Sequence, residues 1–282
     1  MSARSTSQGS MIDGFVRGRW FLPTALVLGL VFLYGPIATL VVYSFNESRL
    51  VTVWSGFSVK WYGSLAHNDQ ILDAAWLSLR VAVASATGAL VVGTLAGYVL
   101  SRFTKFRGRT LFAGMVTAPL VMPEIITGIS MLLMFVGLEQ AIGWPAGRGV
   151  LTIIMAHITF CMSFVAVIVQ SRLSGMDVSV EEAAMDLGAR PVQVFFLITL
   201  PLMAPALVAG WLLAFSLSLD DLVITAFVSG PGSTTLPLVI FSKVRLGLSP
   251  EIHALATVII TVVSMGVFAA ALYQYKRGKT LG

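Results

Sequence analysis

Six long apolar segments dominate this sequence, and each is long enough to cross a lipid bilayer. About 20 apolar residues span the hydrocarbon core as an α-helix. Hydrocarbon cannot satisfy exposed backbone groups, and uninterrupted apolar segments differ from the alternating strands of a barrel. The expected fold class is therefore all-α, a polytopic membrane protein with six transmembrane helices near residues 21–44, 76–100, 110–136, 150–170, 197–219 and 254–273.

The composition excludes an ordinary soluble domain and a disordered chain. Hydrophobic residues make up 57% of the 282 residues and charged residues only 11%, whereas about 25% of a typical soluble protein is charged. The single cysteine, Cys161, lies in an apolar segment, so neither an internal disulfide nor a cysteine metal cluster is expected. The first apolar segment is too long for the core of a signal peptide, so we expect it to be retained.

Basic residues are distributed unequally between the connecting segments. The positive-inside rule places both termini in the cytoplasm, because twelve of the 18 Lys and Arg residues then lie inside, five lie outside and Arg80 lies within the second segment. Basic loops beside apolar segments favour contact with membrane lipid over nucleic acid. The inner set is Arg4, Arg17, Arg19, Arg102, Lys105, Arg107, Arg109, Arg172, Arg190, Lys276, Arg277 and Lys279, and the outer set is Arg49, Lys60, Arg148, Lys243 and Arg245.

Small residues and prolines mark particular helix faces. Ser85, Ala89, Gly93 and Gly97 recur on one face of the second segment, a spacing that favours close packing against another helix. Prolines are expected to interrupt the third and fifth segments, either kinking the helices or lining a pathway. These prolines are Pro119 and Pro123 in the third segment and Pro201 and Pro205 in the fifth.

The loop from Asp177 to Pro191, between the fourth and fifth segments, is predicted to form a short helix of about two turns. Ser179 and Glu182 have the spacing of a capping box, and Gly188 supplies a stop. Ala183 and Ala184 would make the helix thin enough for a partner to approach its backbone. On these local signals alone, an ordinary surface helix is the favoured interpretation.

This loop resembles the EAA motif of ABC-importer permeases. The motif reads E-A-A-x(3)-G followed by nine residues and I-x-L-P, and the sequence matches it at Glu182, Ala183, Ala184, Gly188, Ile198, Leu200 and Pro201. Further segments are similar to polyamine-importer permeases, so that the resemblance covers nearly the whole chain; Glu124 stands where that family would have aspartate. These segments are Ala118–Glu124, His157–Cys161, Leu217–Leu222 and Ser229–Pro231.

The resemblance implies a type I permease fold and a bacterial inner-membrane importer of polyamine, most closely putrescine. The motif residues would couple to a cytoplasmic ATPase. The implied partners are a second, homologous permease, two ATPase subunits and a periplasmic polyamine-binding protein, and ATP and Mg would be used by the ATPase alone. The organisation would be a cytoplasmic segment 1–20, a permease domain 21–275 containing coupling loop 174–196, and a basic tail 276–282.

No catalytic or metal site is expected in the chain. Gly278-Lys279-Thr280 imitates the end of a P-loop, but Tyr273 stands where the first glycine is required. His67, His157 and His253 share no ligand spacing, and His157 is expected to hydrogen-bond between helices.

Acidic residues within or beside two proline-containing segments are candidates for a cation pathway. Glu124 lies inside the third segment and shares a helical stripe with Thr127 and Gly128, whereas Asp220 and Asp221 end the fifth. Trp211 and Phe215 could supply apolar walls for the methylenes of a diamine. Two structural alternatives remain open: Glu124 pairs with Arg80 or caps a broken helix, and the aspartates merely end the segment.

Two other functions also remain open. Spermidine or another small cation could be the substrate, since no local residue measures chain length. An ion-coupled secondary transporter, with Glu124 carrying protons, would need no ATPase.

Overall fold

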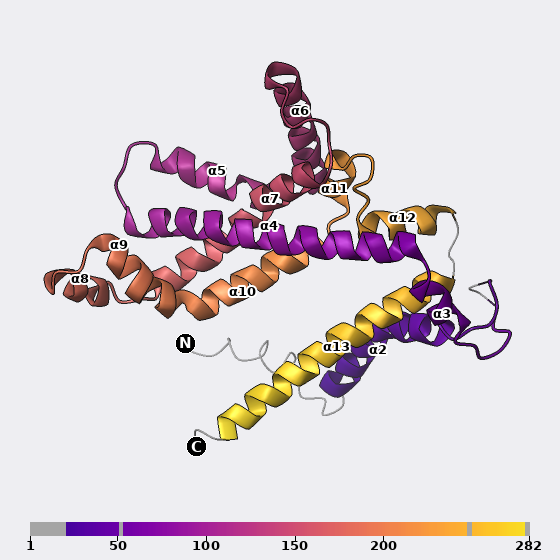
Figure 1. The fold of residues 1–282 in the computed structure, drawn as a ribbon. Coiled ribbons are helices and arrows are strands. Elements are labelled where there is room, and N and C mark those ends of the chain that lie inside the picture. Colours follow the sequence, from indigo (N-terminus) through magenta and orange to yellow (C-terminus); the bar gives the residue numbers. More distant parts are fainter. Residues whose placement is uncertain (1–20, 51–52, 247–249, 280–282) are drawn as a thin grey trace, which may run out of the picture. The chain divides into compact units, whose positions relative to one another are not determined.

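The structure is a computed structural model that describes residues 21–50, 53–246 and 250–279. Its regular elements in these ranges are helices, with one isolated bridge between Asn46 and Phe57 (Figure 1). This confirms the all-α class. The predicted segment 1–20 and residues 280–282 of the predicted tail lie outside the described residues.

The chain forms two compact units, residues 1–68 with 243–282, and residues 69–242. In the first, α2 (Phe21–Tyr43) and α3 (Lys60–Ala66) pack against α13 (Pro250–Lys279). The unit boundary falls within α12 (Leu236–Leu246). The second unit contains α4 (Asp69–Arg102), α5 (Arg109–Val121), α6 (Glu124–Ile142), α7 (Val150–Ser174), α8 (Ser179–Asp186), α9 (Pro191–Val194), the π-helical turn η1 (Phe195–Thr199), α10 (Leu200–Leu219) and α11 (Val223–Val228).

Five helical stretches of the described residues are long and apolar enough to cross a membrane: α2, α4, α6, α7 and the continuous stretch Pro191–Leu219. Four of them match predicted segments, and α6 overlaps only the end of the predicted segment 110–136. The remaining predicted segment, 254–273, lies within α13, whose apolar described part runs from Pro250 to Gly266. The chain is thus a multi-pass membrane protein.

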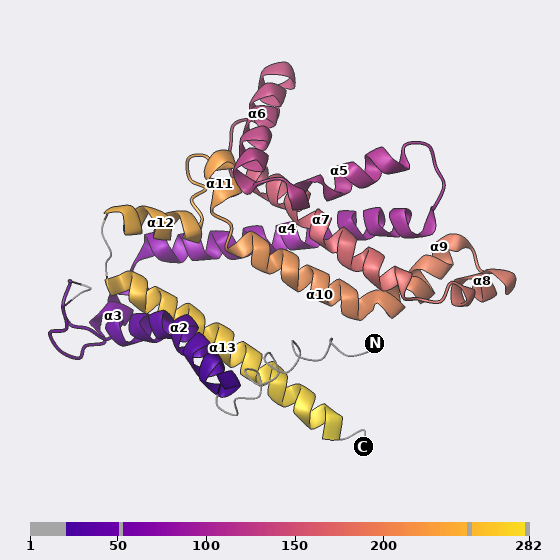
Figure 2. The same cartoon turned by 180° about the vertical axis from the view of Figure 1, so that it is seen from behind.

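Helices α4, α7 and α10 pack together and form the core of the second unit (Figure 2). The small-residue face of α4 makes this packing close. A Cβ atom added to Gly93 would lie 2.7 Å from the Met162 carbonyl oxygen, and one added to Gly97 would lie 2.7 Å from that of Ala166. The stripe Ser85, Ala89, Gly93 and Gly97 therefore serves helix packing, as its spacing predicts.

The predicted single span at 110–136 is wrong, because the structure divides it into α5 and α6. Met122 adopts an extended conformation, with φ −76° and ψ 136°, and α6 begins at Glu124. The steric demand of Pro123 pushes the preceding residue out of the helical region, and its missing N–H cannot continue the helical hydrogen-bond pattern. Pro119 lies inside α5 without ending it.

The fifth segment is not broken at its prolines, contrary to expectation. The helical path runs from Pro191 to Leu219, with Pro205 inside α10 and Pro201 in its first turn. One π-helical turn, η1, precedes Pro201 and accommodates an extra residue in that turn.

Candidate functional site

The predicted short helix is α8, which runs from Ser179 to Asp186 and confirms the expected two turns. The predicted capping box is wrong: Ser179 is the first helical residue, and the Asp177 carboxylate accepts a hydrogen bond from its backbone N–H at 2.9 Å. Hydrogen bonds from Ser179 lower the pKa of Asp177 below its ordinary value. Sequence spacing cannot distinguish these caps, because both residues have suitable oxygen acceptors.

Gly188 ends this helical region as predicted. Its φ of +91° lies in the left-handed region that disfavours a side chain. The Gly188 N–H donates to the Met185 carbonyl at 2.9 Å, and the Ala189 N–H donates to that of Ala184 at 3.1 Å. The turn therefore satisfies carbonyl groups at the end of α8 before the chain enters α9.

The two adjacent glutamates of α8 have opposite surroundings. Glu182 and Ala183 are exposed, and Leu187 beyond the helix is 90% exposed, whereas Glu181 is buried. The motif glutamate and first alanine thus lie on an open surface with an apolar side chain nearby. The remaining motif residues lie further along the chain: Ile198 in η1, and Leu200 and Pro201 in the first turn of α10.

The inner face of α8 contains an ion pair that sequence reasoning missed. Arg102, at the end of α4, donates to both carboxylate oxygens of Glu181, from Nη2 at 2.8 Å and from Nε at 3.0 Å. The hydroxyl of Thr199 in η1 donates to the same carboxylate at 2.9 Å. Charge alone does not identify this arrangement, because the loop offers four acids, Asp177, Glu181, Glu182 and Asp186, to several arginines.

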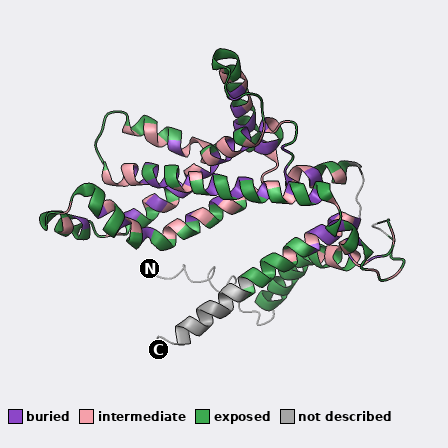
Figure 3. Cartoon of the chain, viewed as in Figure 1, coloured by how far each residue is buried: buried purple, intermediate pink, exposed green. Residues whose placement is uncertain are grey.

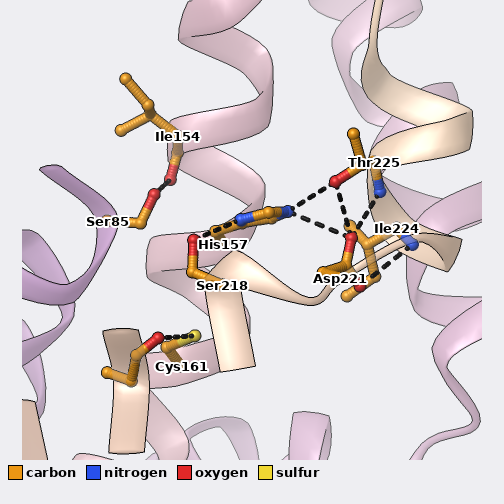
Figure 4. A network of polar contacts seen from close by, with 9 residues as sticks. Ser85, Ile154, His157, Cys161, Ser218, Asp221, Ile224 and Thr225 are labelled. Atoms are coloured by element: carbon orange, nitrogen blue, oxygen red, sulfur yellow. Dashed lines mark hydrogen bonds and ion pairs between the residues drawn. The ribbon is translucent and has the colours of Figure 1, made fainter. Parts of the chain in front are cut away.

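A second polar network joins α7 to the break between α10 and α11 (Figure 4). His157 lies 2.7 Å from the Ser218 hydroxyl through Nδ1 and 2.9 Å from that of Thr225 through Nε2. Thr225 donates its single hydroxyl proton to Asp221 at 2.7 Å, so its oxygen is free to accept from Nε2 of His157. The prediction that His157 makes interhelical hydrogen bonds is confirmed.

Asp221 belongs to this network. Its carboxylate lies 3.2 Å from His157 Nε2 and accepts the backbone N–H groups of Ile224 and Thr225 in the first turn of α11. Its side chain is buried. A carboxylate at a helix N-terminus is stabilised by the helix dipole and the free N–H groups. These contacts favour a structural role for Asp221, whereas the neighbouring Asp220 is exposed.

Glu124 is exposed at the first position of α6, beside the break at Pro123. Among the described residues its carboxylate forms no ion pair, so the alternative pairing with Arg80 is not found there. Thr127 and Gly128, predicted to share a polar stripe with it, are instead buried, and Gly128 lies close to Phe227 of α11. Packing of α6 against α11 covers Thr127 and Gly128 but not Glu124, so the predicted stripe does not form one exposed surface.

Trp211 and Phe215 stack on α10 with ring centroids 5.3 Å apart, and both are half-buried. The Trp211 indole N–H donates to Thr87 of α4 at 3.2 Å. The structure therefore places Trp211 against α4, with Phe215 stacked on it. Their predicted role as walls of a substrate pathway stays a prediction.

These features define an α-helical membrane permease with an exposed loop helix. The family described as "Binding-protein-dependent transport system inner membrane component" matches residues 89–277, and the chain belongs to this family. It is therefore a multi-pass transport component of the inner membrane.

Relatives and solved structures agree with this assignment. The chain is 58% identical to the "Putrescine transport system permease protein PotI" of Escherichia coli strain K12, over 90% of each chain. It is 44% identical to the "Spermidine/putrescine transport system permease protein PotC" of the same strain, over 96% of this chain and 98% of that one.

The fold is that of a solved bacterial ABC transporter "involved in the import of the acidic polysaccharide alginate", with 17% identity and a TM-score of 0.65. That alignment covers 97% of this chain and 99% of the other. The MetNI methionine ABC transporter also aligns, at a TM-score of 0.57 and 17% identity, over 71% of this chain and 92% of that one. The type I ABC-importer permease fold is thus confirmed.

Proposed function

We propose that this chain is one permease subunit of an ATP-driven importer that moves putrescine from the periplasm to the cytoplasm. The observation that carries the coupling role is the open surface of α8, where Glu182, Ala183 and Leu187 are exposed on a short helix with a fixed end. Exposed apolar side chains outside membrane-spanning helices are typical of protein interaction sites. The 58% identity to a putrescine permease supports the substrate.

The proposed assembly contains a second, homologous permease, two ATPase subunits and a periplasmic polyamine-binding protein. ATP and Mg²⁺ belong to the ATPase subunits, and this chain binds no cofactor itself. Gly278 and Lys279 of the P-loop-like sequence lie in the last turn of helix α13, whereas a P-loop needs a phosphate-cradling loop; Thr280 lies outside the described residues. Both termini and α8 would lie in the cytoplasm.

In the proposed pathway, Glu124 and Asp220 attract the ammonium groups of the substrate. Both carboxylates are exposed. Trp211 and Phe215 would contact the methylenes through their half-buried rings. Asp221 would act at a distance, by holding the start of α11 beside Asp220. Spermidine is the second candidate substrate, and the 44% identity to a spermidine/putrescine permease supports it.

Uptake by the complete complex in proteoliposomes tests this proposal. Radiolabelled putrescine should enter only with ATP on the α8 side and with the substrate-loaded binding protein on the other side. Glu182→Lys should abolish the stimulated ATPase activity and the uptake while leaving membrane insertion intact. Uptake that follows an ion gradient without ATP would support a secondary transporter, and stronger competition by spermidine than by putrescine itself would reassign the substrate.

A further inference from the structure

The buried face of α8 carries a polar cluster that joins four elements of the chain. Glu181 of α8 accepts from Arg102 at the end of α4 and from Thr199 of η1. The guanidinium also donates from Nη1 to the Leu173 carbonyl at the end of α7, at 3.3 Å. One carboxylate and one guanidinium thus tie α8 to the ends of α4 and α7 and to the turn that leads into α10.

Arg102, Glu181 and Thr199 together form what we call the joint, and its geometry is rigid. The two hydrogen bonds from Nε and Nη2 form a fork that fixes the orientation of both planar groups. The side chains of Arg102 and Glu181 are only 14% and 8% exposed, and Thr199 is fully buried. A buried charge pair adds little net stability because both ions lose their hydration, so its best-supported benefit is a defined geometry.

An aromatic contact joins two of the elements that form the joint, α4 and η1. Tyr98, one helical turn before Arg102, meets Phe195 of η1 edge to face, with ring centroids 4.9 Å apart. The π-helical turn η1 contains both Phe195 and Thr199. It therefore presents one ring to α4 and one hydroxyl to Glu181.

The surfaces of α8 divide into an outward face, with Glu182, and an inward face, with Glu181. We infer that Arg102, Glu181 and Thr199 are the positioning residues that make α8 move together with the ends of α4, α7 and α10. A force applied to the outward face by an ATPase would then reach the transmembrane helices through this joint. The inference rests on the proposed function, because it takes α8 to be the docking helix of an ATPase.

The test compares Glu181→Gln with Asp186→Asn in the complete complex. Both changes neutralise an acid of α8, but Asp186 is exposed and outside the joint. Glu181→Gln should retain the ATPase subunits, since the outward face is unchanged, while putrescine imported per ATP falls about fivefold or more, within the usual range of coupling between sites. Asp186→Asn should leave this ratio unchanged.

Arg102→Lys provides a conservative variant that keeps the charge and loses the fork. It should lower the ratio of putrescine imported to ATP hydrolysed. The double variant Arg102→Lys with Glu181→Gln should have a ratio no lower than that of the poorer single variant, because both substitutions disrupt the same joint. An unchanged import-to-ATP ratio in assembled Glu181→Gln complexes, or additive losses in the double variant, would overturn the inference.

A distance measurement tests the joint without relying on transport. Spin labels at positions 107 and 186, in complexes whose Cys161 is replaced by serine, report the separation of α8 from the loop after α4. Glu181→Gln should broaden this distance distribution, whereas an unchanged distribution would overturn the joint. If wild-type complexes show no ATP-dependent uptake but Glu181→Gln still broadens the distribution, the proposed function fails while the mechanical joint stands.

Discussion

Helices α7 and α2 are equally apolar, yet they are buried to opposite extents. The most apolar 18-residue stretch of each helix has a mean hydropathy of 2.3, but 56% of that stretch is buried in α7 and none of it in α2. Figure 3 shows α2 exposed along its length, whereas buried residues recur along α7. Hydropathy therefore predicts which segments enter the membrane, and it does not predict which of them pack within the chain.

The difference arises from complementary surfaces. Lipid is as apolar as a leucine side chain, so helices in a membrane associate through close packing and hydrogen bonds. Helix α7 meets the small-residue face of α4 and hydrogen-bonds through His157 to Ser218 and Thr225. The glycines of α2, Gly29 and Gly35, have no described atom within 4 Å of an added Cβ. Within its own unit, α2 packs against α13 and leaves most of its surface exposed.

The largest effect is expected from filling the α4–α7 contact. Gly93→Leu adds four carbon atoms at a position where even a Cβ lies 2.7 Å from Val165 Cβ. The free energy of unfolding should therefore fall by about 3 kcal/mol. Gly29→Leu in α2 is the matched control and should change stability by less than about 0.5 kcal/mol. Unfolding in detergent measures the stability of both variants. Equal losses of stability would contradict the difference between the packed α7 and the exposed α2.

A smaller loss is expected when the polar network of α7 is removed. His157→Leu keeps a similar volume but leaves the Ser218 hydroxyl without its His157 partner and removes one contact of the buried Asp221 carboxylate, which should cost about 2 kcal/mol. Thr39→Val removes a local hydrogen bond on exposed α2 and should be nearly neutral. Thermal unfolding midpoints compare the two variants. A neutral His157→Leu would show that the network does not hold α7 against α10 and α11.

Exposed carboxylates should affect transport instead of stability. Glu124→Gln and Asp220→Asn should each lower putrescine uptake at low concentration about tenfold, equivalent to about 1.4 kcal/mol, with assembly unchanged. Asp221→Asn should instead lower the unfolding temperature, because its carboxylate is buried and bonded to Thr225 and His157. Unchanged uptake by assembled Glu124→Gln and Asp220→Asn complexes would reject the pathway role.

The smallest effect is expected from truncating an exposed side chain of α2. Phe32 is 85% exposed in spite of its size, so Phe32→Ala should change the free energy of unfolding by less than about 0.5 kcal/mol. Phe135 of α6 is fully buried, so Phe135→Ala should lower the free energy of unfolding by about 3 kcal/mol. Destabilisation of the isolated chain by Phe32→Ala would show that α2 has an internal partner.

Much of the fold could be predicted because its signals are local. Membrane insertion follows from apolar length, and the end of the α8 region follows from Gly188, since its left-handed conformation favours glycine. The break between α5 and α6 is only partly predictable, because a proline can lie inside a helix or stand at its end, as Pro205 and Pro123 respectively show. The surroundings of the helix decide between these outcomes.

The sequence by itself determined the apolar spans, the small-residue face of α4 and the motif around Glu182, because these depend on residue type and short spacing. Only the tertiary structure decided that Glu181 turns inward to Arg102 while Glu182 stays exposed, and that Asp221 is bonded to His157 while Asp220 is open. Adjacent residues of the same type look alike in a sequence. Their roles differ because hydrogen-bond partners distant in the chain approach one member of each pair and not the other.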